Sequence, residues 1–271
     1  MLRIARVATK DNEKIEIILK ESAKHLSLAN LNLTPPELAD SPYKLVYKIT
    51  GNNDPYKEIK EAHIKTALNL YPMLKEMVKK SSDKLLESVK ISIMGNAIDL
   101  GSTFDSIEID LNEFLKSNFN LNDFEDLKNA VKNSRNIFLI GDNAGETVFD
   151  RVLIETLTEL GRNVKYAVKS KPIINDATIE DALKSGITNV IETGSSMAGT
   201  ILYTVNEDFL KELENSDLII AKGQANYETL SEESLPIFFL LKIKCAPIAR
   251  SIGHSIGTNI VLKSKKFKLK S

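Results

Sequence analysis

The chain contains few of the residues from which disulfide frameworks and catalytic zinc sites are built. Its single cysteine, Cys245, excludes an internal disulfide bond and a cluster of thiolate metal ligands. Its three histidines, His25, His63 and His254, lie far apart and show no His-x-x-Glu-His spacing, which argues against a catalytic zinc site. We therefore interpret Cys245 as a small core residue and the histidines as residues of helix surfaces or loops.

An excess of charge of one sign and long hydrophobic runs are also absent. With 36 Lys and Arg residues against 37 Asp and Glu residues, the net charge is −1, so no basic field indicates nucleic acid or a membrane as partner. No apolar run reaches membrane-spanning length, and no signal peptide with a cleavage site is present. We expect a cytoplasmic protein that binds neither nucleic acid nor membranes, and we interpret the basic tail, residues 263–270, as a solvated terminus.

Three common active-site motifs are missing as well. There is neither the Gly-Lys-Ser/Thr ending of a Walker P-loop nor the Gly-x-Gly-x-x-Gly dinucleotide fingerprint, and the second absence argues against a dehydrogenase. The Gly-x-Ser-x-Gly elbow of α/β-hydrolases is not found either. With 42% hydrophobic and 27% charged residues, the composition is that of an ordinary globular protein with a sizeable core.

Residues 1 to about 100 show only helical patterns. Asp11 is expected to cap the first long helix, and Thr34-Pro-Pro-Glu37 has the spacing of a capping box. A third helix is expected to start at Asp54-Pro55 and to break or kink at Pro72, and a fourth to end at Gly95. This half of the chain therefore predicts an all-helical N-terminal domain.

From residue 127 onward, strand and helix patterns alternate, which predicts a mostly parallel sheet covered on both faces. The expected strands are residues 137–140, 164–168, 189–192, 218–221, 237–243 and 259–262. We therefore expect an α/β protein: a helical domain, residues 1–110, followed by a Rossmann-like three-layer domain, residues 111–271. The polar stretch 101–126 is the candidate boundary.

The most informative segment is residues 136–146, Asn-Ile-Phe-Leu-Ile-Gly-Asp-Asn-Ala-Gly-Glu. Its apolar run predicts a buried strand, and the polar residues Asp142, Asn143 and Glu146 follow in a turn that leads into a helix. Oxygen ligands of this kind suit a hard divalent cation such as Mg²⁺ or Mn²⁺, and the start of the helix suits a phosphate. The segment predicts metal-assisted chemistry on a phosphorylated substrate.

Polar clusters follow four of the expected strands, and right-handed crossovers place all four at one edge of the sheet. The clusters are Gly141 to Glu146, Lys171 to Thr178, Thr193 to Thr200 and Lys222 to Glu228. Asp142, Asn143 and Asp176 are the candidate metal ligands, and Lys222 is a candidate for neutralising phosphate charge in the transition state. The small-residue loop from Thr193 is expected to present backbone N–H groups to phosphate.

Each of these candidates also has a plainer interpretation. Asp142 and Asn143 can form a turn and a helix cap, Asp176 can begin a helix, and Lys222 can be a solvated lysine at a strand end. In the helical half, Gly95-Asn96-Ala-Ile-Asp99-Leu-Gly101 is either a helix C-cap or a second wall of the site.

Taken together, the motifs of this chain resemble those of the metal-dependent damage-control phosphatases, long catalogued as domain of unknown function 89, and in particular their compact archaeal and bacterial branch. The matching strings span nearly the whole chain in family order: Thr34-Pro-Pro-Glu37, Asp54-Pro-Tyr-Lys57, Tyr71-Pro-Met-Leu-Lys75, Gly95-Asn-Ala-Ile-Asp99, Gly141-Asp-Asn-Ala-Gly-Glu146, Pro172-Ile-Ile-Asn-Asp-Ala-Thr178, Lys222-Gly-Gln-Ala-Asn-Tyr-Glu228 and Leu240-Leu-Lys-Ile-Lys-Cys245. Members of this branch usually begin with a Cys-x-x-Cys segment. The first six residues here resemble the sequence just after it, so no role for those cysteines is carried over.

The resemblance implies a helical N-terminal domain on a Rossmann-like domain and a divalent metal, Mn, Mg, Co or Ni, held by Asp142, Asn143 and Asp176. It also implies phosphate and substrate contacts at four positions, which are Asn96, Asp99, Glu146 and Lys222. The activity it implies is hydrolysis of phosphate monoesters of small phosphometabolites such as sugar phosphates or phosphopantetheine-like compounds. Some members have also been proposed to methylate carboxylates on proteins.

We therefore expect a metal-dependent phosphatase in which Lys222 shares the phosphoryl charge and Asp142 is the best candidate for nucleophile or general base. Two alternatives stay open: an S-adenosylmethionine-dependent carboxyl methyltransferase, and a non-catalytic module that binds a metal and a metabolite. The sequence does not decide the substrate, the native metal or the oligomeric state.

Overall fold

A seven-stranded sheet forms the centre of the computed structural model, which describes residues 1–97 and 119–267, with only the backbone of residues 96 and 97. The strand order is β1-β7-β6-β5-β2-β3-β4, and the pairs are parallel except that β7 runs antiparallel to β6. The strands are β1 Phe119–Asn120, β2 Asn136–Ile140, β3 Asn163–Val168, β4 Val190–Glu192, β5 Leu218–Lys222, β6 Ile237–Lys242 and β7 Asn259–Lys263. All six strands expected from the sequence are present, and the two-residue β1 is additional.

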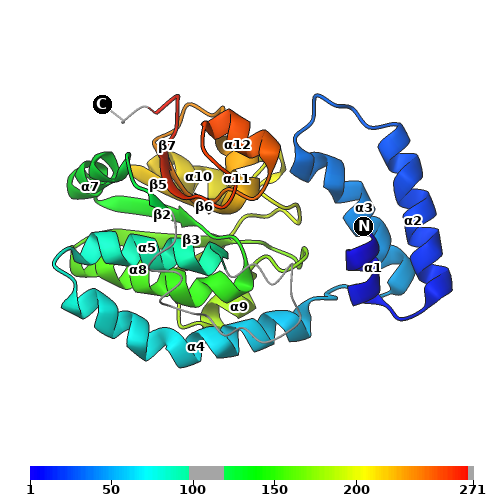
Figure 1. Cartoon of the computed structure of the whole chain (residues 1–271), viewed down its shortest axis with the longest axis horizontal. Coiled ribbons are helices and arrows are strands. Elements are labelled where there is room, and N and C mark those ends of the chain that lie inside the picture. The colour runs from blue at the N-terminus through cyan, green and yellow to red at the C-terminus, as the bar shows by residue number, and fades with distance from the viewer. Residues whose placement is uncertain (98–118, 268–271) are drawn as a thin grey trace.

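Helices cover both faces of this sheet, which gives the three layers expected from the sequence (Figure 1). One face packs against α4, α5 and α8, and the other against α10, α11 and α12. The helices are α1 Leu2–Ala8, α2 Asn12–Ser27, α3 Pro35–Thr50, α4 Lys57–Lys80, α5 Lys84–Ala97, α7 Phe124–Asn133, α8 Thr147–Glu159, α9 Ile179–Lys184, α10 Glu207–Asn215, α11 Gly223–Leu230 and α12 Ala246–Ile252, with short 3₁₀ turns η1 Ala144–Glu146 and η2 Leu202–Thr204. The α/β fold class is confirmed.

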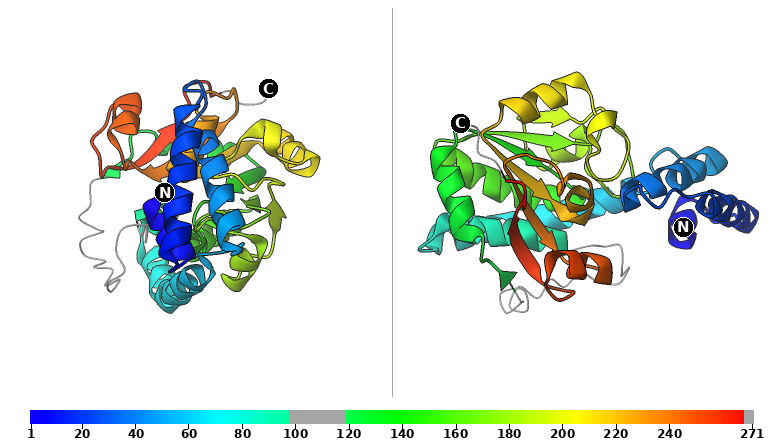
Figure 2. Two further views of the ribbon diagram at one scale, coloured as in Figure 1. Left: turned by 90° about the vertical axis from the view of Figure 1, so that its right-hand side faces the viewer. Right: turned by 90° about the horizontal axis from the view of Figure 1, so that it is seen from above.

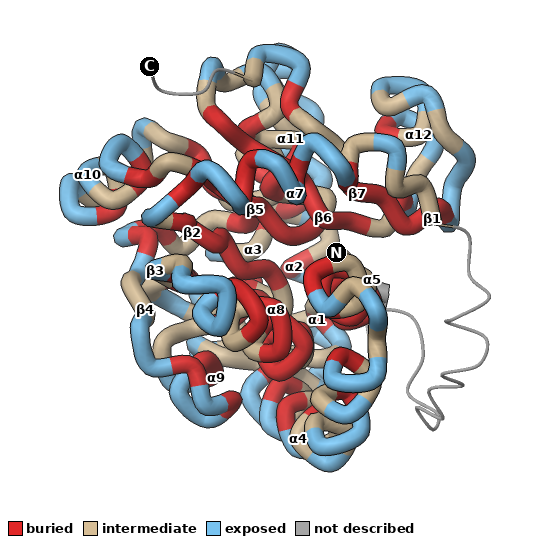
Figure 3. Tube along the Cα trace, turned by 90° about the vertical axis from the view of Figure 1, so that its left-hand side faces the viewer, coloured by how far each residue is buried: buried red, intermediate tan, exposed pale blue. Residues whose placement is uncertain are grey.

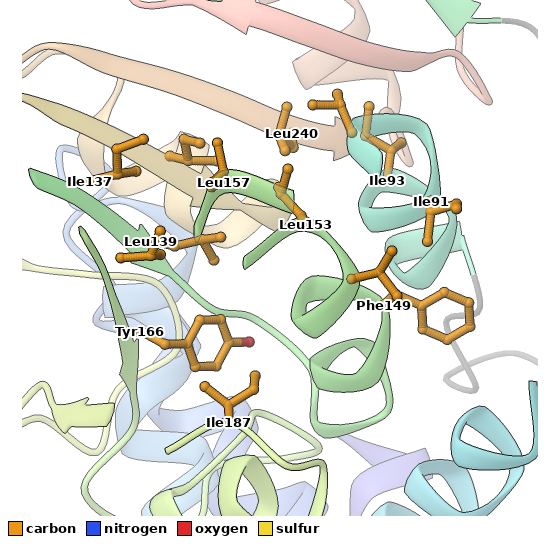
Figure 4. Packing of buried hydrophobic residues seen from close by; sticks show 14 of the residues in the cluster. Ile91, Ile93, Ile137, Leu139, Phe149, Leu153, Leu157, Tyr166, Ile187 and Leu240 are labelled. Atoms are coloured by element: carbon orange, nitrogen blue, oxygen red, sulfur yellow. The ribbon is translucent and has the colours of Figure 1, made fainter. Parts of the chain in front are cut away.

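The strands are hydrophobic along nearly their whole length because both of their faces are covered. Buried residues run through β2, β5, β6 and α8, while exposed residues lie on the outer turns of the surrounding helices (Figure 3). Ile137 and Leu139 of β2 face Leu153 and Leu157 of α8, with Tyr166 of β3 beside them (Figure 4). This core holds the carboxyl ends of β2, β3 and β5 in fixed positions.

Helices α2 and α3 begin as the sequence predicts, whereas α4 begins at Lys57, two residues after the expected start at Asp54-Pro55. The Asp11 side chain accepts hydrogen bonds from the backbone N–H groups of Glu13 and Lys14, and Thr34 and Glu37 form a capping box. These caps fix where α2 and α3 start.

Two expectations about where helices end need correction. Pro72 does not break α4, which continues to Lys80 because buried Leu74 and Val78 hold its second half against the core, and the alternative of a kink there stays a prediction. Gly95 does not end α5 either. A Cβ atom at Gly95 would lie 3.0 Å from Cβ of Phe149 and 3.2 Å from Cα of Glu146, so this glycine permits close packing between helices.

The N-terminal helices divide into two groups by the core to which they contribute. Helices α1, α2 and α3, which we call the helical lobe, enclose a small cluster centred on Ala5, Ile18 and Val46. The lobe projects from the body of the molecule (Figure 2), whereas α4 and α5 share the main core with the sheet. The domain boundary predicted at residue 110 lies outside the described residues and stays a prediction.

Within the described residues, no helix combines the length and the hydrophobicity needed to cross a membrane.

Candidate functional site

The candidate site lies where the chain leaves β2, at the carboxyl edge of the sheet. β2 sits between β3 and β5, so the loops that follow these three strands spread from a point where the strand order reverses. Such a switch point is where open α/β sheets bind their ligands. Asp142 follows β2, Asp176 lies in the loop after β3, and Gly223 opens the helix after β5.

Backbone hydrogen bonds join the first two of these loops. The Ala177 N–H donates to the carbonyl of Asp142 over 2.8 Å, and the Ala144 N–H donates to the carbonyl of Asn175 over 2.8 Å. Asn143 and Asp176 form an isolated β-bridge between these bonds. The three predicted metal ligands are thus brought together by main-chain geometry.

Asp142 and Asp176 are both buried, at 9% and 4% exposure, as is Glu146 at 1%. The Asn143 side-chain nitrogen donates to Oε1 of Glu146 over 2.7 Å and to Oδ2 of Asp142 over 3.2 Å, which leaves its oxygen as the atom suited to bind a cation. Burial raises the pKa of Asp142 well above its usual range, and the carboxylates of Glu146 and Asp176 raise it further.

These residues fit a divalent metal. In the described part of the chain, no three His, Cys, Asp or Glu side chains are grouped so that they could hold a metal ion. The candidate ligands are therefore two carboxylates, Asp142 and Asp176, and one amide, Asn143. All the donors are oxygens, which Mg²⁺ and Mn²⁺ prefer, and a cation would stabilise carboxylates that burial and mutual repulsion disfavour. Gly223 approaches so closely that a Cβ there would overlap with Oδ2 of Asp142, and its lack of a side chain leaves room for this carboxylate beside the loop after β5.

Lys222, the last residue of β5, is fully buried, at 0% exposure. Its Nζ donates to Oδ1 of Asp150 over 2.6 Å, to Oε2 of Glu146 over 3.0 Å and to the Ser92 carbonyl over 3.0 Å. Burial alone lowers the pKa of Lys222, but the charges of Asp150 and Glu146 outweigh it and the net shift is upward. All three N–H bonds of Lys222 are used inside the protein, so its predicted contact with substrate stays a prediction.

The sequence did not single out Asp150, Ser92 or Tyr166, which complete the surroundings of Lys222. The Ser92 hydroxyl donates to Oδ1 of Asp150 over 2.7 Å, and the Tyr166 hydroxyl donates to Oδ2 over 2.9 Å. Each occupies an ordinary core position of a helix or strand. In the sequence, only Asp150 could have indicated this cluster, because a charged residue on the buried side of the helical pattern that starts at residue 147 is unusual.

Lys169, just after β3, is a second buried cation that the sequence did not reveal. Its Nζ donates to the carbonyl of Gly199 and lies 3.8 Å from Oδ2 of Asp176. Burial lowers the pKa of Lys169, with Asp176 opposing. Lys169 therefore ties the small-residue loop after β4 to the predicted metal site.

Asn226 of α11 makes a further connection between the loops. Its Nδ2 donates to the carbonyls of Gly141 over 3.1 Å and Lys222 over 2.7 Å, and its Oδ1 accepts from the Thr200 hydroxyl over 2.8 Å. The four loops that carry polar clusters in the sequence are consequently held as one unit.

Three tyrosines, Tyr43 and Tyr47 of α3 and Tyr56 before α4, lie close to one another near this unit. The Tyr47 hydroxyl accepts a hydrogen bond from the Ile174 N–H over 3.1 Å. Burial raises the pKa of Tyr43 to about 12, and the charge of Asp176 raises it as well. The helical lobe thus faces the predicted metal site.

The other residues considered from the sequence are placed as follows. Asn96 lies in the last turn of α5, but its side chain and all of Asp99 fall outside the described residues. His63 is half-buried against Gly145, and His254 contacts the side chain of Asn120. Cys245 is half-buried at the edge of the core and accepts a weak hydrogen bond from Gln224.

Comparison with known proteins identifies the family of the chain. The family model of the damage-control phosphatase ARMT1-like domain matches residues 1–260. The chain belongs to this family. A damage-control phosphatase of Pyrococcus horikoshii is 36% identical over 98% of this chain and 94% of its own length, and one of Archaeoglobus fulgidus is 36% identical over 93% and 91%.

Two further proteins are similar to this damage-control phosphatase family member in sequence or in fold. An uncharacterized protein of Methanocaldococcus jannaschii is 42% identical over 82% of this chain and 77% of its own. A crystal structure of a DUF89 family protein from Pyrococcus horikoshii superposes with a TM-score of 0.87, at 35% identity, over 97% of this chain and 94% of that one. The resemblance seen in the sequence is confirmed, and the family supports a phosphatase of damaged metabolites.

Proposed function

We propose that the protein is a divalent-metal-dependent phosphatase, located in the cytoplasm, that hydrolyses phosphate monoesters of small metabolites such as sugar phosphates or phosphopantetheine-like compounds. The observation that carries this proposal is the meeting of Asp142, Asn143 and Asp176 at the switch point of the sheet. The phosphatase names of its relatives supply the reaction type, and the all-oxygen donor set supplies the metal requirement.

The metal, Mn, Mg, Co or Ni, would be held by Asp142, Asn143 and Asp176, and would polarise the phosphoryl group and orient its oxygens. Glu146 keeps the Asn143 amide turned so that its oxygen faces the site, because it accepts the hydrogen bond of the amide nitrogen. Lys222 pairs with Glu146 and Lys169 lies beside Asp176, so the two lysines offset part of the carboxylate charge that would repel a phosphate ester.

Asp142 is the candidate that activates the attacking group. As a nucleophile it would form a phosphoryl-aspartate, and as a general base it would accept a proton from water. Predicted substrate contacts at Glu146, Asn96 and Asp99 would surround the leaving group or the phosphate.

The test is phosphate release from p-nitrophenyl phosphate with Mn²⁺, Mg²⁺, Co²⁺ or Ni²⁺ and with EDTA. The wild type is compared with Asp142→Asn, with Asp176→Asn and with a control, Asp208→Asn, which changes an exposed carboxylate of α10. We expect metal-restored activity that falls at least about 100-fold in the first two variants and persists in the control. Activity retained by both site variants would contradict the assignment, and saturable S-adenosylmethionine binding without metal would favour carboxyl methylation.

A further inference from the structure

Among the described residues, Ile174 is the one non-glycine residue with a positive φ, 44°. A β-branched side chain in this left-handed region is strained because its Cβ atom crowds the neighbouring backbone. Such strain persists only where surrounding contacts hold the backbone in place. Ile174 lies two residues before the predicted metal ligand Asp176, so what holds it bears on the site.

One contact that holds the Ile174 peptide comes from the helical lobe. Its N–H donates to the hydroxyl of Tyr47, a residue of α3, over 3.1 Å. Within the loop, the Asp176 N–H donates to the carbonyl of Ile173 over 3.0 Å and closes a turn around Ile174 and Asn175. The Asn175 carbonyl also accepts from the Ala144 N–H of the loop after β2. The strained residue is therefore fixed between the lobe and the loop after β2.

We propose that Tyr47 is a positioning residue that acts through Ile174. Its hydroxyl holds the Ile174 peptide in the left-handed conformation, and this conformation directs Asp176 toward Asp142 and Asn143. The docked lobe thereby completes a metal site whose ligands all belong to the α/β part. This inference rests on the proposed metal site.

The construction of the lobe supports this role. The lobe has a small core of its own, separate from the main core, so its internal packing does not depend on the sheet. Side-chain hydrogen bonds connect it to the α/β part through Tyr47 with Ile174, and through the Tyr203 hydroxyl with Oε1 of Glu37 over 2.5 Å. The first of these reaches the loop that carries Asp176, whereas the second reaches the loop after β4.

The experiment uses the full chain and the variant Tyr47→Phe, which removes the hydroxyl and keeps the ring. Two quantities are measured: the Kd of Mn²⁺ alone by titration calorimetry, and the amide hydrogen exchange of residues 170–178. We expect Mn²⁺ to bind about tenfold more weakly and the loop to exchange faster, because losing one hydrogen bond frees a strained peptide. The control Tyr203→Phe removes the other of these two hydrogen bonds and should change neither quantity.

A rescue separates positioning from general loosening of the lobe. Glycine adopts a positive φ without strain, so the double variant Tyr47→Phe/Ile174→Gly should bind Mn²⁺ within about twofold of the wild type. Absence of rescue, or equal effects of Tyr47→Phe and Tyr203→Phe, would overturn the proposal. Unchanged Mn²⁺ affinity together with unchanged exchange in Tyr47→Phe would overturn it as well.

Failure of the proposed function would give a different result from failure of the positioning role. If the wild type binds no Mn²⁺, the metal assignment fails, and loop exchange alone then decides the role of Tyr47. Faster exchange confined to residues 170–178 in Tyr47→Phe would support the positioning role, and unchanged exchange would refute it.

Discussion

Gly223 shows how closely the backbone approaches the predicted metal site. Its φ is +79°, and a Cβ there would overlap with Oδ2 of Asp142, so any side chain must displace that carboxylate. We expect Gly223→Ala to lose phosphatase activity by at least about 100-fold, in addition to the strain of about 1–2 kcal/mol that a positive φ imposes.

The matched control is Gly161→Ala. Gly161 has a similar φ of +78°, but a Cβ there would meet no other atom within 4 Å. Both variants carry the backbone strain of a positive φ, but only Gly223→Ala adds the overlap with Asp142, so only Gly223→Ala should lose activity. Equal activity of the two variants would show that the approach to Asp142 is unimportant.

Lys222 is expected to contribute strongly to stability because two carboxylates depend on it. In Lys222→Met, Glu146 and Asp150 stay buried without the cation that pairs with them. Removing one partner of a buried ion pair lowers the free energy of unfolding by about 3–5 kcal/mol. Urea unfolding measures this difference. The exposed Lys211, which pairs weakly with Glu207 and Asp208, provides the control: Lys211→Met should change stability by less than about 0.5 kcal/mol.

Glu228 of α11 gives a prediction about pH. Burial raises its pKa above 4.5, and the hydrogen bond from Gln224 only partly opposes this. The folded state therefore holds the proton more tightly than the unfolded chain, so the stability linked to Glu228 is complete below pH 4.5 and is lost as pH rises through the folded pKa. The Tm of Glu228→Gln should match the wild type near pH 4 and exceed it at neutral pH; a constant difference would contradict this.

At the scale of single residues, the sequence predicted the candidates that follow strands. Asp142, Asn143 and Asp176 were found because loops after parallel strands converge at one edge. Lys169 and Asp150 were missed because a charged residue next to a strand or within a helix has no distinctive spacing; only the fold shows that both are buried. The solvated alternative for Lys222 is excluded by its burial.

A shared carboxylate connects α4, from the predicted helical domain, to α8, from the predicted α/β domain. The Tyr71 hydroxyl donates to both oxygens of Glu155, at 2.6 and 2.7 Å, and Lys75 and Arg151 reach the same carboxylate at 2.7 and 2.8 Å. The Arg151 guanidinium also stacks on the Tyr71 ring at 4.2 Å. One carboxylate thus joins the two helices.

Removing this carboxylate should weaken the attachment of α4. We expect Glu155→Ala to lower the free energy of unfolding by about 1–2 kcal/mol, since it removes charge-assisted hydrogen bonds from several partners. Glu159→Ala is the control, because Glu159 is more exposed and lies 3.7 Å from Lys75. If urea unfolding gives the same loss for both, the shared carboxylate is not the source of the stability.

At the scale of elements, apolar runs predicted the strands correctly, whereas predictions of helix ends from single residues were wrong. Pro72 and Gly95 are helix breakers by intrinsic preference, yet α4 and α5 continue through them. Packing against the core outweighs the lost hydrogen bond at Pro72, and Gly95 lies where a side chain would collide with Phe149. β1 was missed because two residues are too few to show a period.

At the scale of the whole molecule, the helical lobe should unfold before the rest. Its cluster centres on three fully buried residues, whereas the two clusters on the faces of the sheet are much larger. Native-state hydrogen exchange should therefore give lower opening free energies for α1, α2 and α3 than for α8 and β2. Equal protection of the lobe and the sheet would show that the two unfold as one unit.

The grouping of Tyr43, Tyr47 and Tyr56 beside the site has an optical consequence. The chain has seven tyrosines and no tryptophan, so its ultraviolet emission comes from tyrosine alone, and three of the seven emitters lie where the lobe meets the loops. Departure of the lobe would expose these phenols to water and alter their quenching. The unlabelled protein therefore carries an intrinsic signal by which opening of the lobe can be followed in real time.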